Sequence, residues 1–505
     1  MCAHEDSNEA RATGESPFFG DVCLLGLGVT GLAVVDFFCN NQTYLSSLSI
    51  YSSDIQPDRL AYLQTLPEFV SVHVGDEPVS GTFDLAVVSP GIPPSSDLYL
   101  SAQKAATEVI SEPELAWRIA PERWIAITGT NGKTTVTELI ATLLQISGRV
   151  AWATGNIGTP CIEIIEKREP TDWLVAELSS YQLHSTVRFA PDVAVLLNIT
   201  PDHLSWHGTH ENYVKAKEHI LANVAADAPV VLDVCLPETR AIADELARQG
   251  RRVIRVGSEE GLVMSRVAKS ADTDDEENAQ PRQETAFVDS DTGELTLELA
   301  QGTYTLLHAD ELSLKGPHNC SNALAAAAVA AGLGVDPEEI NAVLAYFAPL
   351  PHRFEPCGEV SGVTFINDSK ATNTDAAIKA LSSFEDETRS GTVVAMLGGH
   401  DKGTDLADLV RACKVACRSV VCYGEAGKRF FAVMRTEVHA VLEQHFDEAF
   451  EHAYELAQSG DTVLLSPACA SFDEFDSFEA RGRRFKENVA QLQASHHVKA
   501  NGDAS

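Results

Sequence analysis

Basic residues are scarce in this sequence of 505 residues. Its 37 lysines and arginines are outnumbered by 73 aspartates and glutamates, which gives a formal net charge of −36 at pH 7. A surface of that sign repels phosphate backbones, so the composition argues against a protein that binds nucleic acid. Any polyanionic ligand must therefore be held locally, and we expect glycine loops, lysine and Mg²⁺ to hold it.

Long apolar runs and the features of a signal peptide are also missing. The longest apolar run, residues 323–333, has about half of the roughly 20 residues that a membrane span needs. Residues 1–16 are polar and acidic, without the apolar centre of a signal peptide. We therefore expect a cytoplasmic protein without membrane insertion.

Paired cysteines of the CxxC type, which zinc sites favour, do not occur. The 11 cysteines are scattered, and the closest set, Cys413, Cys417 and Cys422, has gaps that suit the packing of a helix and a strand. We interpret them as reduced thiols in a cytosolic protein. An apolar fraction of 44% and a charged fraction of 22% are ordinary for a globular chain and exclude wholesale disorder.

Strands alternate with helices along the chain, which predicts α/β domains with parallel sheets. The predicted strands are residues 22–25, 48–51, 85–88, 124–127, 173–176, 193–197, 392–397, 419–423 and 462–466. We place domains at 21–121, 122–348 and 349–495, with disordered tails at 1–20 and 496–505. The acidic stretch 269–291 is interpreted as a surface insertion, and 111–114 as a polar connection.

The first glycine loop, Gly26-Leu27-Gly28-Val29-Thr30-Gly31, follows a strand and opens a helical stretch. Its glycines allow a tight turn and a close approach of backbone N–H groups to a diphosphate. A nicotinamide site favours an acid after the second strand, where this chain has Ser52 and Ser53, with Asp54 a little late. The loop therefore suits any nucleotide diphosphate, and a turn without a ligand stays open.

The second glycine loop, Thr128-Gly129-Thr130-Asn131-Gly132-Lys133-Thr134-Thr135, also follows a strand and opens a helix. It differs from the standard GxxxxGK[ST] pattern because Ile127 replaces the first glycine. Lys133 can reach the β- and γ-phosphates of a nucleotide, and the Thr134 hydroxyl can ligate Mg²⁺. The loop predicts a site for a nucleoside triphosphate.

Acidic and imidazole side chains follow the next two strands. Glu177 comes directly after strand 173–176, and Asp202 and His203 follow strand 193–197. Ligands of open α/β sheets bind beyond the carboxyl ends of the strands, so these groups and the second glycine loop should share one crevice. The set suits Mg²⁺ and a triphosphate. His207 and His210 are expected at the surface, with a zinc site around His203 as a less favoured alternative.

These residues and several further motifs resemble the Mur ligases of peptidoglycan synthesis, whose relatives include folylpolyglutamate synthase. The resemblance covers about residues 20–490 and includes the segments SPGI at 89–92, GNIG at 155–158, LPHRFE at 350–355, NDSKATN at 367–373 and LSPACASFD at 465–473. It implies a Rossmann-like UDP-binding domain, a central P-loop-type ATPase domain with a mostly parallel sheet, and a Rossmann-like C-terminal domain.

The motifs are most similar to the branch of this family that adds D-glutamate to UDP-N-acetylmuramoyl-L-alanine (UDP-MurNAc-L-Ala). The resemblance implies that ATP phosphorylates a carboxylate and that an amine then attacks the acyl phosphate. Positioning and cations should carry most of that catalysis. It also implies ATP and Mg²⁺ as requirements and three small-molecule substrates. We expect a monomer.

The resemblance assigns residues to each ligand, position by position. The implied catalytic residues are Lys133, Glu177, His203 and Lys217, and the implied metal ligands are Thr134, Glu177, His203 and, if it is carbamylated, Lys217. The residues implied to bind ATP are Gly129, Thr130, Asn131, Gly132, Lys133, Thr134, Thr135, Asn319, Asn322, Arg353, Asp368 and Lys370. The residues implied to bind the UDP-sugar are Gly28, Val29, Thr30, Ser89, Pro90, Gly91 and Asn156. The residues implied to bind D-glutamate are Thr372, Lys402, Ser471 and Phe478.

Several alternatives stay open. Without the resemblance, Lys217 would be a solvated helix lysine, Asn319 or Ser321 a helix cap, and Ser471 and Phe478 packing residues. A ligase for a different amino acid would favour an Asp-Asn-Pro-Arg loop, or histidine in place of Asn131; neither occurs, so this alternative fits less well. A dehydrogenase built on the first glycine loop leaves the second loop unexplained. A non-catalytic relative would be expected to lack the residue types at 133, 177, 203 and 402, all of which are present.

Overall fold

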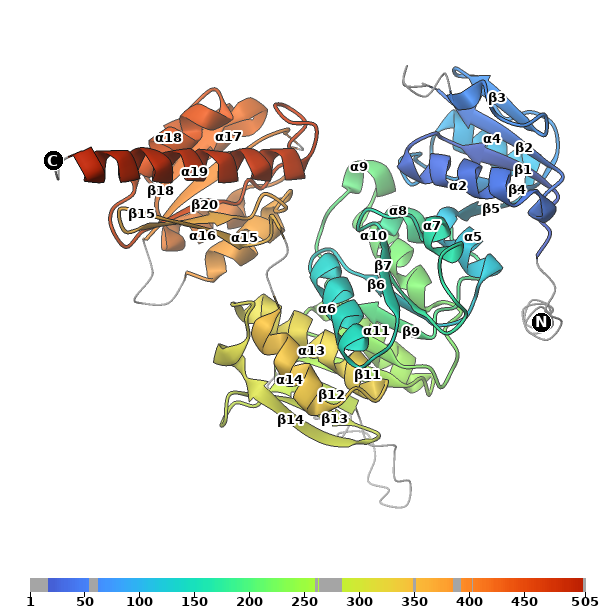
Figure 1. The fold of residues 1–505 in the computed structure, drawn as a ribbon, viewed down its shortest axis with the longest axis horizontal. Coiled ribbons are helices and arrows are strands. Elements are labelled where there is room, and N and C mark those ends of the chain that lie inside the picture. The colour runs from blue at the N-terminus through green and yellow to red at the C-terminus, as the bar shows by residue number, and fades with distance from the viewer. Residues whose placement is uncertain are drawn as a thin grey trace. The chain divides into compact units, whose positions relative to one another are not determined.

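The computed structural model describes residues 17–53, 62–258, 262, 284–347, 351–384, 392–401 and 403–502, except the side chains of 205 and 495–502. It divides into two compact units. Residues 1–311 and 321–345 form the first unit, and residues 312–320 and 346–505 form the second. Two sheets lie in the first unit and one in the second (Figure 1).

The first sheet is parallel throughout, with the strand order β3-β2-β1-β4-β5. Its strands are β1 (Asp21–Leu25), β2 (Ser47–Ser52), β3 (Val70–Val74), β4 (Phe83–Val88) and β5 (Ala106–Ser111). Side chains alternate along each strand, so β1 supplies two cores. Val22 and Leu24 pack with helix α2 (Val29–Asn40), and Cys23 and Leu25 pack with α4 (Asp97–Ala105). This is the expected Rossmann-like arrangement.

The beginning of this sheet corrects the predicted N-terminal tail. Phe19 is buried against Phe38, and its backbone N–H donates to Tyr44 O at 2.7 Å. The tail prediction is therefore wrong for residues 17–20, because an aromatic side chain there completes the core. Residues 1–16 lie outside the described residues.

The polar connection predicted at 111–114 is also wrong. It forms the end of β5 and the start of helix α5 (Glu112–Ile119), and Glu112 and Glu114 are buried. Glu112 Oε1 accepts the Ile162 N–H at 2.6 Å, and Glu114 accepts the Arg188 N–H at 2.9 Å. These carboxyl groups replace water as partners of the backbone of neighbouring segments, which is why acidic residues could be buried here.

The second sheet has the order β14-β13-β12-β11-β10-β9-β6-β8-β7, parallel from β7 to β12 and antiparallel beyond. Its strands are β6 (Trp124–Thr128), β7 (Ala151–Gly155), β8 (Trp173–Glu177), β9 (Val193–Leu196), β10 (Val230–Asp233), β11 (Val253–Ser258), β12 (Glu284–Val288), β13 (Glu294–Leu299) and β14 (Gly302–His308). The predicted insertion at 269–291 is wrong for residues 284–288, which form a largely buried strand. Residues 269–283 lie outside the described residues.

The helices of this region include α6 (Lys133–Ile146), α7 (Cys161–Ile165), α8 (Ser180–His184), α9 (Leu204–His207), α10 (His210–Glu218), α11 (Pro237–Arg248), α13 (Pro317–Gly332) and α14 (Pro337–Tyr346). Strand β6 lies between β8 and β9, as the crevice prediction requires. The three strand ends that carry the glycine loop, Glu177 and the segment leading to His203 are therefore neighbours.

The third sheet has the order β15-β16-β20-β17-β18-β19. Its strands are β15 (Glu355–Val360), β16 (Val363–Asn367), β17 (Val393–Gly398), β18 (Cys417–Tyr423), β19 (Ala440–Leu442) and β20 (Thr462–Leu465), and its helices are α15 (Thr374–Ser382), α16 (Ala407–Ala416), α17 (Gly424–Met434), α18 (Phe446–Leu456) and α19 (Phe478–Gly502). Only β15 pairs antiparallel with its neighbour. Residues of helices pack against both faces of this sheet.

Both faces of this sheet are buried. Val394 and Met396 point into one core, whereas Ala395 and Leu397 point into the other. The latter core also holds Cys413, Cys417 and Cys422, which lie in α16 and β18, as their spacing predicts.

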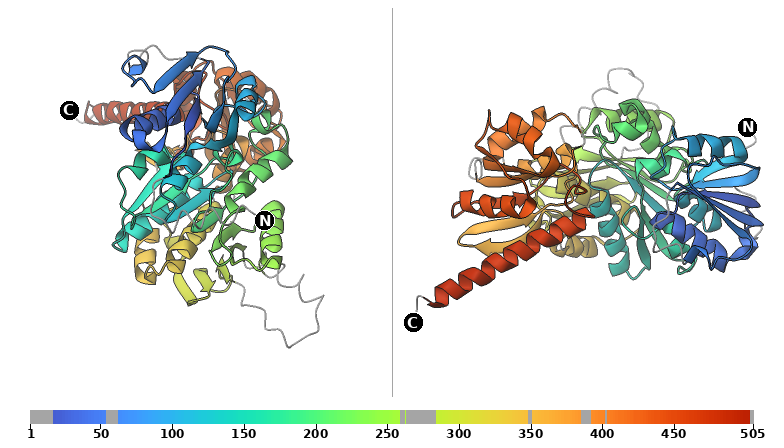
Figure 2. Two further views of the ribbon diagram at one scale, coloured as in Figure 1. Left: turned by 90° about the vertical axis from the view of Figure 1, so that its right-hand side faces the viewer. Right: turned by 90° about the horizontal axis from the view of Figure 1, so that it is seen from above.

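Helix α19 corrects the predicted C-terminal tail. It continues without a break to Gly502 (Figure 2), so the prediction of disorder is wrong for residues 496–502. Alanine, glutamine and lysine favour a helix even where the sequence is polar. Within the described part of the chain, no helix is long and apolar enough to cross a membrane.

Candidate active site

The second glycine loop joins β6 to α6, and two of its glycines adopt backbone angles that favour glycine. Gly129 has φ +156° and Gly132 has φ +85°. A Cβ atom on Gly132 would lie 2.3 Å from Asn322 Oδ1. The structure therefore brings Asn322, which is buried, directly against the loop that the sequence assigned to ATP.

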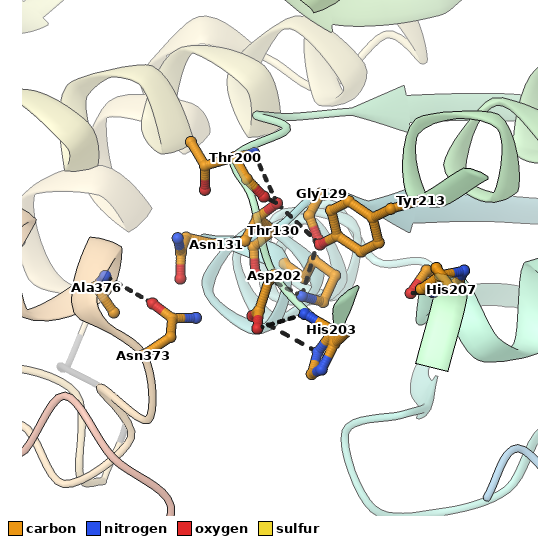
Figure 3. Close-up of polar contacts among 12 residues, drawn as sticks. Gly129, Thr130, Asn131, Thr200, Asp202, His203, His207, Tyr213, Asn373 and Ala376 are labelled. Carbon is orange, nitrogen blue, oxygen red and sulfur yellow. Dashed lines mark hydrogen bonds and ion pairs between the residues drawn. The ribbon is translucent and has the colours of Figure 1, made fainter. Parts of the chain in front are cut away.

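The segment after β9 and Tyr213 of α10 brace this loop. Thr130 N donates to Asn198 O at 2.7 Å, and Asn131 N donates to Asn198 Oδ1 at 2.9 Å. The Thr130 hydroxyl shares a 2.9 Å hydrogen bond with the Tyr213 hydroxyl and accepts the Thr200 N–H at 3.0 Å (Figure 3). Asn198 and Tyr213 were not among the predicted residues. The sequence signal for Asn198 was its place directly after a buried strand.

Lys133 lies at the first turn of α6, beside its own loop. Its Nζ donates to Gly129 O and to Thr130 O, both at 2.9 Å. Thr134 follows it in the first turn and is partly exposed, whereas Thr135 is buried. The N-terminus of a helix and a lysine thus place positive charge on one loop, the arrangement that phosphate oxygens require.

Lys217 of α10 reaches the same loop. Its Nζ donates to Gly129 O at 2.7 Å and lies 4.8 Å from the centre of the Tyr213 ring. The side chain is 2% exposed, and burial, together with the charge of Lys133, holds its pKa well below the usual value. The interpretation as a solvated helix lysine is therefore wrong, because α10 packs with this side chain turned inward.

Glu177 stands at the end of β8, 2% exposed. Its Oε1 accepts from Asn156 Nδ2 at 2.9 Å, and its carbonyl accepts the Asn156 N–H at 2.8 Å. Asn156, which the resemblance assigned to the UDP-sugar, thus lies beside the carboxylate assigned to the metal. Burial and the charge of Glu177 raise the pKa of Glu138, a carboxyl that the sequence analysis did not single out.

His203 is the N-cap residue of α9 and has φ 53°, a left-handed conformation that is uncommon outside glycine. Its Nε2 lies 3.6 Å from Asp202 Oδ2 (Figure 3). Its ring packs 4.9 Å from that of Tyr181. The side chain is 37% exposed. A carboxylate and an aromatic ring therefore orient an imidazole that solvent still reaches.

The prediction of a surface position is wrong for His207. It is buried, and its Nε2 is hydrogen-bonded to Ser180 Oγ at 2.9 Å. Burial, chiefly, lowers its pKa to about 4, so it is neutral near pH 7. His210 is partly exposed, 3.9 Å from Glu238. Among the described residues, no group of three histidine, cysteine or acidic side chains is arranged to hold a metal by itself.

The first glycine loop closes on the segment after β4. Gly26 has φ +88°, and a Cβ on Gly31 would lie 2.0 Å from Gly26 O. Ser89 N donates to Leu25 O at 2.9 Å, and Ser89 Oγ donates to Gly26 O at 3.2 Å. The structure thus brings together the two segments assigned to the UDP-sugar, 26–31 and 89–91, and leaves Gly28, Val29 and Gly91 exposed.

The remaining predicted residues belong to the second unit, with one group around Asp368. Ser466 Oγ donates to Asp368 Oδ2 at 2.8 Å, and the Phe354 N–H donates to Oδ1 at 3.2 Å. Burial nevertheless raises the pKa of Asp368 to about 7, although these bonds and the charge of Arg353 oppose the shift. Arg353 and Asp368, both assigned to ATP, are therefore neighbours.

A second group joins residues assigned to different substrates. Lys370 Nζ lies 3.8 Å from the centre of the Phe478 ring, a cation–π contact, and Thr372 N donates to Lys370 O at 2.8 Å. Ser369 Oγ donates to Phe478 O at 2.8 Å. Lys370, Thr372 and Phe478 thus lie together in the second unit.

Arg481 is a buried residue that the sequence analysis missed. It is fully buried, and its guanidinium donates to Ser369 O at 2.9 Å, Cys469 O at 3.0 Å and Ala470 O at 3.2 Å. It ties the segment of Lys370 to the segment that leads into Ser471, which is itself buried. Its position one turn after Phe478 in a helix gave little sign of this role.

Two predicted residues stand apart from these groups. Asn319 Nδ2 donates to Lys315 O at 2.8 Å within the second unit. Lys402, assigned to D-glutamate, lies outside the described residues.

Comparison with known proteins identifies the class that this fold and loop define. The MurD-like N-terminal domain of Mur ligases matches residues 20–111, the Mur ligase middle domain matches 127–330, and the Mur ligase glutamate ligase domain matches 352–469. The chain therefore belongs to the Mur ligase family.

Its relatives within the family include enzymes named UDP-N-acetylmuramoylalanine–D-glutamate ligase. The protein from Alkaliphilus metalliredigens is 35% identical over 484 residues, which cover 94% of this chain and 98% of the relative. The protein from Pelotomaculum thermopropionicum is 36% identical over 476 residues, with the same coverage of each chain.

Solved structures with the same fold include two further ligases from Thermotoga maritima. The UDP-N-acetylmuramate–alanine ligase MurC has a TM-score of 0.56 at 19% identity and covers 94% of this chain and 99% of its own. The MurF ligase in complex with ADP has a TM-score of 0.55 at 17% identity and covers 94% and 96%. At these identities the likeness confirms the fold alone.

Proposed function

We propose that this protein is an ATP-dependent ligase that joins D-glutamate to UDP-MurNAc-L-Ala in peptidoglycan precursor synthesis. The observation that carries the proposal is the convergence of Lys133, Glu177 and Lys217 on one glycine loop, in a chain whose relatives are named for this reaction along nearly their whole length. ATP is the substrate expected of this family at such a loop.

The reaction needs activation because a carboxylate alone is a poor acyl donor. In the proposed reaction, a carboxylate oxygen of UDP-MurNAc-L-Ala attacks the γ-phosphorus of ATP, and ADP leaves. The D-glutamate amine then forms the C–N bond to the acyl carbon and loses a proton, and phosphate departs. Negative charge spreads over the transferred phosphoryl oxygens, so the cation of Lys133 and the N-terminus of α6 supply the stabilisation.

The side chains around the loop also fit Mg²⁺. Thr134 offers a hydroxyl, Glu177 a buried carboxylate and His203 a solvent-accessible imidazole, and the triphosphate would complete an oxygen-rich set. When bound, Mg²⁺ would neutralise phosphate charge. Asn156 orients Glu177 for that task through its 2.9 Å hydrogen bond, and Asp202 contacts His203.

Lys217 is proposed to be carbamylated. Its depressed pKa favours the neutral amine, the form that reacts with CO₂. The nitrogen would form a bond to the CO₂ carbon and lose a proton, leaving a carbamate anion near Lys133. That anion could serve as a metal ligand where a cationic lysine could not.

The other assignments are proposed on the groupings within each unit. Segments 26–31 and 89–91 would hold the UDP group, and Asn322 would flank the nucleotide at Gly132. In the second unit, Arg353, Asp368 and Lys370 would contact ATP, and Thr372, Ser471, Phe478 and Lys402 would contact D-glutamate. Asn319 is proposed to lie near the adenine of ATP.

We further propose that the protein acts as a monomer in the cytoplasm, where ATP and nucleotide-linked precursors are available. We also propose that the chain has three domains, at 21–121, 122–348 and 349–495. The three matched family domains support this division. Light scattering should give one chain mass; a dimer mass would reject the monomer.

The function is tested with a panel of D- and L-amino acids, ATP and UDP-MurNAc-L-Ala, scored by phosphate release. We expect release only with D-glutamate and only when all three substrates are present. Lys402→Ala should raise the KM for D-glutamate far more than that for ATP. Turnover with a different amino acid would reject the substrate assignment, and equal changes in both KM values would reject the role of Lys402.

A further inference from the structure

The turn at residues 352–354 follows a backbone course that few residues other than glycine adopt. His352 has φ 65° and Phe354 has φ 45°, so Arg353 stands between two left-handed residues. Such conformations persist only where the surrounding structure holds them, and they gather at functional sites. The contacts of this turn therefore identify what keeps Arg353 in place.

His352 is held through its backbone and through its ring. Its N–H donates to Glu355 Oε2 at 2.9 Å, and its carbonyl accepts the Lys370 N–H at 3.0 Å. Asn367 Nδ2 donates to His352 Nδ1, also at 2.9 Å. The side chain is buried, and burial, chiefly, lowers its pKa, which suits a neutral imidazole that accepts at Nδ1.

Asn367 connects the partners of His352. It is fully buried at the end of β16, opposite Glu355 of the antiparallel strand β15. Its Nδ2 lies 3.1 Å from Glu355 Oε2, the oxygen that also accepts the His352 N–H, and its Oδ1 accepts the Ser369 N–H at 3.2 Å. Burial opposes ionisation of Glu355, but the hydrogen bond from Lys486, at 2.6 Å, lowers its pKa. One amide therefore contacts both the ring of His352 and the carboxylate that holds its backbone.

Helix α19 packs directly against the ring of His352. A Cβ atom on Gly482 would lie 2.1 Å from His352 Nδ1, so only glycine lets the helix approach this closely. The Gly482 carbonyl also lies 3.3 Å from Asn367 Nδ2. The ring is therefore confined between α19 and the Asn367 amide.

The residue that follows Arg353 is fixed as well. The Phe354 N–H donates to Asp368 Oδ1 at 3.2 Å, and the Phe354 ring packs 5.8 Å from that of Phe384. Because Asn367 and Asp368 are consecutive, the end of β16 supplies partners for both neighbours of Arg353.

We propose that Asn367 is a positioning residue for nucleotide binding. Its amide holds His352 and Glu355, and with them the turn that presents Arg353. Asn367 acts through that guanidinium, and no bond to the nucleotide is assigned to it. This inference rests on the proposed assignment of Arg353 to ATP.

The test measures the Kd for ATP with Mg²⁺ by calorimetry in wild type, Asn367→Asp, Arg353→Ala and the double variant. Asn367→Asp keeps the shape of the side chain and the oxygen that accepts the Ser369 N–H, but it loses the donor. We expect the Kd for ATP to rise about tenfold, equivalent to ~1.4 kcal/mol, and the Kd for UDP-MurNAc-L-Ala to stay at its wild-type value. Arg353→Ala should weaken ATP binding by itself. In that background Asn367→Asp should change the Kd by less than about twofold, because no guanidinium is left to position.

Asn488→Asp is the matched control. Asn488 is also buried in the second unit, and its Nδ2 donates to Asp447 Oδ1 at 2.9 Å, so the substitution likewise sets a carboxylate beside a carboxylate. We expect both substitutions to lower stability in urea, but only Asn367→Asp to weaken ATP binding. If Asn367→Asp does not fold, Gly482→Ala supplies the Kd values. Its added Cβ displaces the ring of His352 without a change of charge, so the Kd for ATP should again rise.

Three results would overturn the inference: a wild-type Kd for ATP in the Asn367 variant, equal rises for ATP and UDP-MurNAc-L-Ala, or effects of the two single variants that add in the double one. Arg353→Ala is measured first. If it leaves the Kd for ATP unchanged, the assignment of Arg353 is wrong and the inference falls with it. If Arg353→Ala weakens ATP binding and Asn367→Asp does not, only the role of Asn367 is rejected.

Discussion

Two glycine loops in the first unit follow the first strand of their sheets and open a helix, yet their surroundings differ. The loop at Gly26–Gly31 is closed by backbone bonds and the hydroxyl of Ser89. The loop at Gly129–Lys133 lies among titratable side chains, with Lys133 and Lys217 bonded to its carbonyls. The comparison teaches that a glycine loop supplies only a cradle of N–H groups, and that neighbouring charge decides whether it binds or reacts.

Lys133→Ala is the strongest test of the difference between the two loops. We expect a loss of at least ~10³-fold in kcat, because the cation at the triphosphate is removed, with UDP-MurNAc-L-Ala affinity retained. Single-turnover phosphate release and binding calorimetry measure the two effects. Near-normal turnover would mean that the second loop has no triphosphate role.

Lys217→Ala should cost less, about 10²-fold to 10³-fold in kcat, since it removes one proposed anion but leaves the loop cation. The matching test on wild type is CO₂ depletion: activity should fall in degassed buffer and return with bicarbonate. Intact-protein mass spectrometry under mild conditions should find the added mass of CO₂. Bicarbonate-independent activity would exclude the carbamate.

Gly31→Ala tests the first loop. Its Cβ would meet Gly26 O at 2.0 Å, so the turn must open, and we expect about 2–4 kcal/mol of lost stability in the first unit. The control is Gly28→Ala, where nothing lies within 4 Å of the added atom and stability should hold. Urea unfolding compares them. Equal stabilities would show that the close approach of Gly31 to Gly26 is not needed.

The last prediction concerns Glu112, which links α5 to Ile162 within the first unit. Burial raises its pKa from 4.5 to about 7, so the folded protein keeps a proton that the unfolded chain loses. Stability is therefore fully present below pH 4.5 and falls as pH rises to about 7. The difference approaches ~3 kcal/mol and is absent in Glu112→Gln.

Urea unfolding of wild type, Glu112→Gln and the exposed control Glu68→Gln at pH 5 and pH 8 measures this effect. Wild type should lose stability relative to Glu112→Gln between the two values, whereas Glu68→Gln should follow wild type. Parallel curves for wild type and Glu112→Gln would contradict the raised pKa.

Much of the fold was predictable because buried parallel strands leave local signals. The runs at 124–127 and 173–176 are apolar throughout and became β6 and β8. The edge strand Val70–Val74 was missed because its mixed pattern, with serine and histidine between valines, is only partly buried. Helix α19 was underestimated because polar composition was taken as disorder.

The burial of polar side chains could not be predicted in the same way. Lys217 and His207 look like solvated helix residues locally, and only the packing of α9 and α10 against β-sheet loops turns them inward. Glu112 is similar, since its hydrogen-bond partner stands 50 positions away. Motif spacing pointed to the glycine loop at 129–133, whereas the roles of Asn198, Tyr213 and Arg481 depend on tertiary partners.

The central claim is that a carboxylate is activated by phosphoryl transfer from the nucleotide at the Gly129 loop. It is tested most directly with UDP-MurNAc-L-Ala labelled with ¹⁸O in its alanine carboxylate, followed by mass analysis of the released phosphate. The account predicts that each phosphate carries one labelled oxygen, because the attacking carboxylate oxygen leaves with the phosphoryl group. Unlabelled phosphate would show that water, not the carboxylate, takes the phosphoryl group, and would contradict the account.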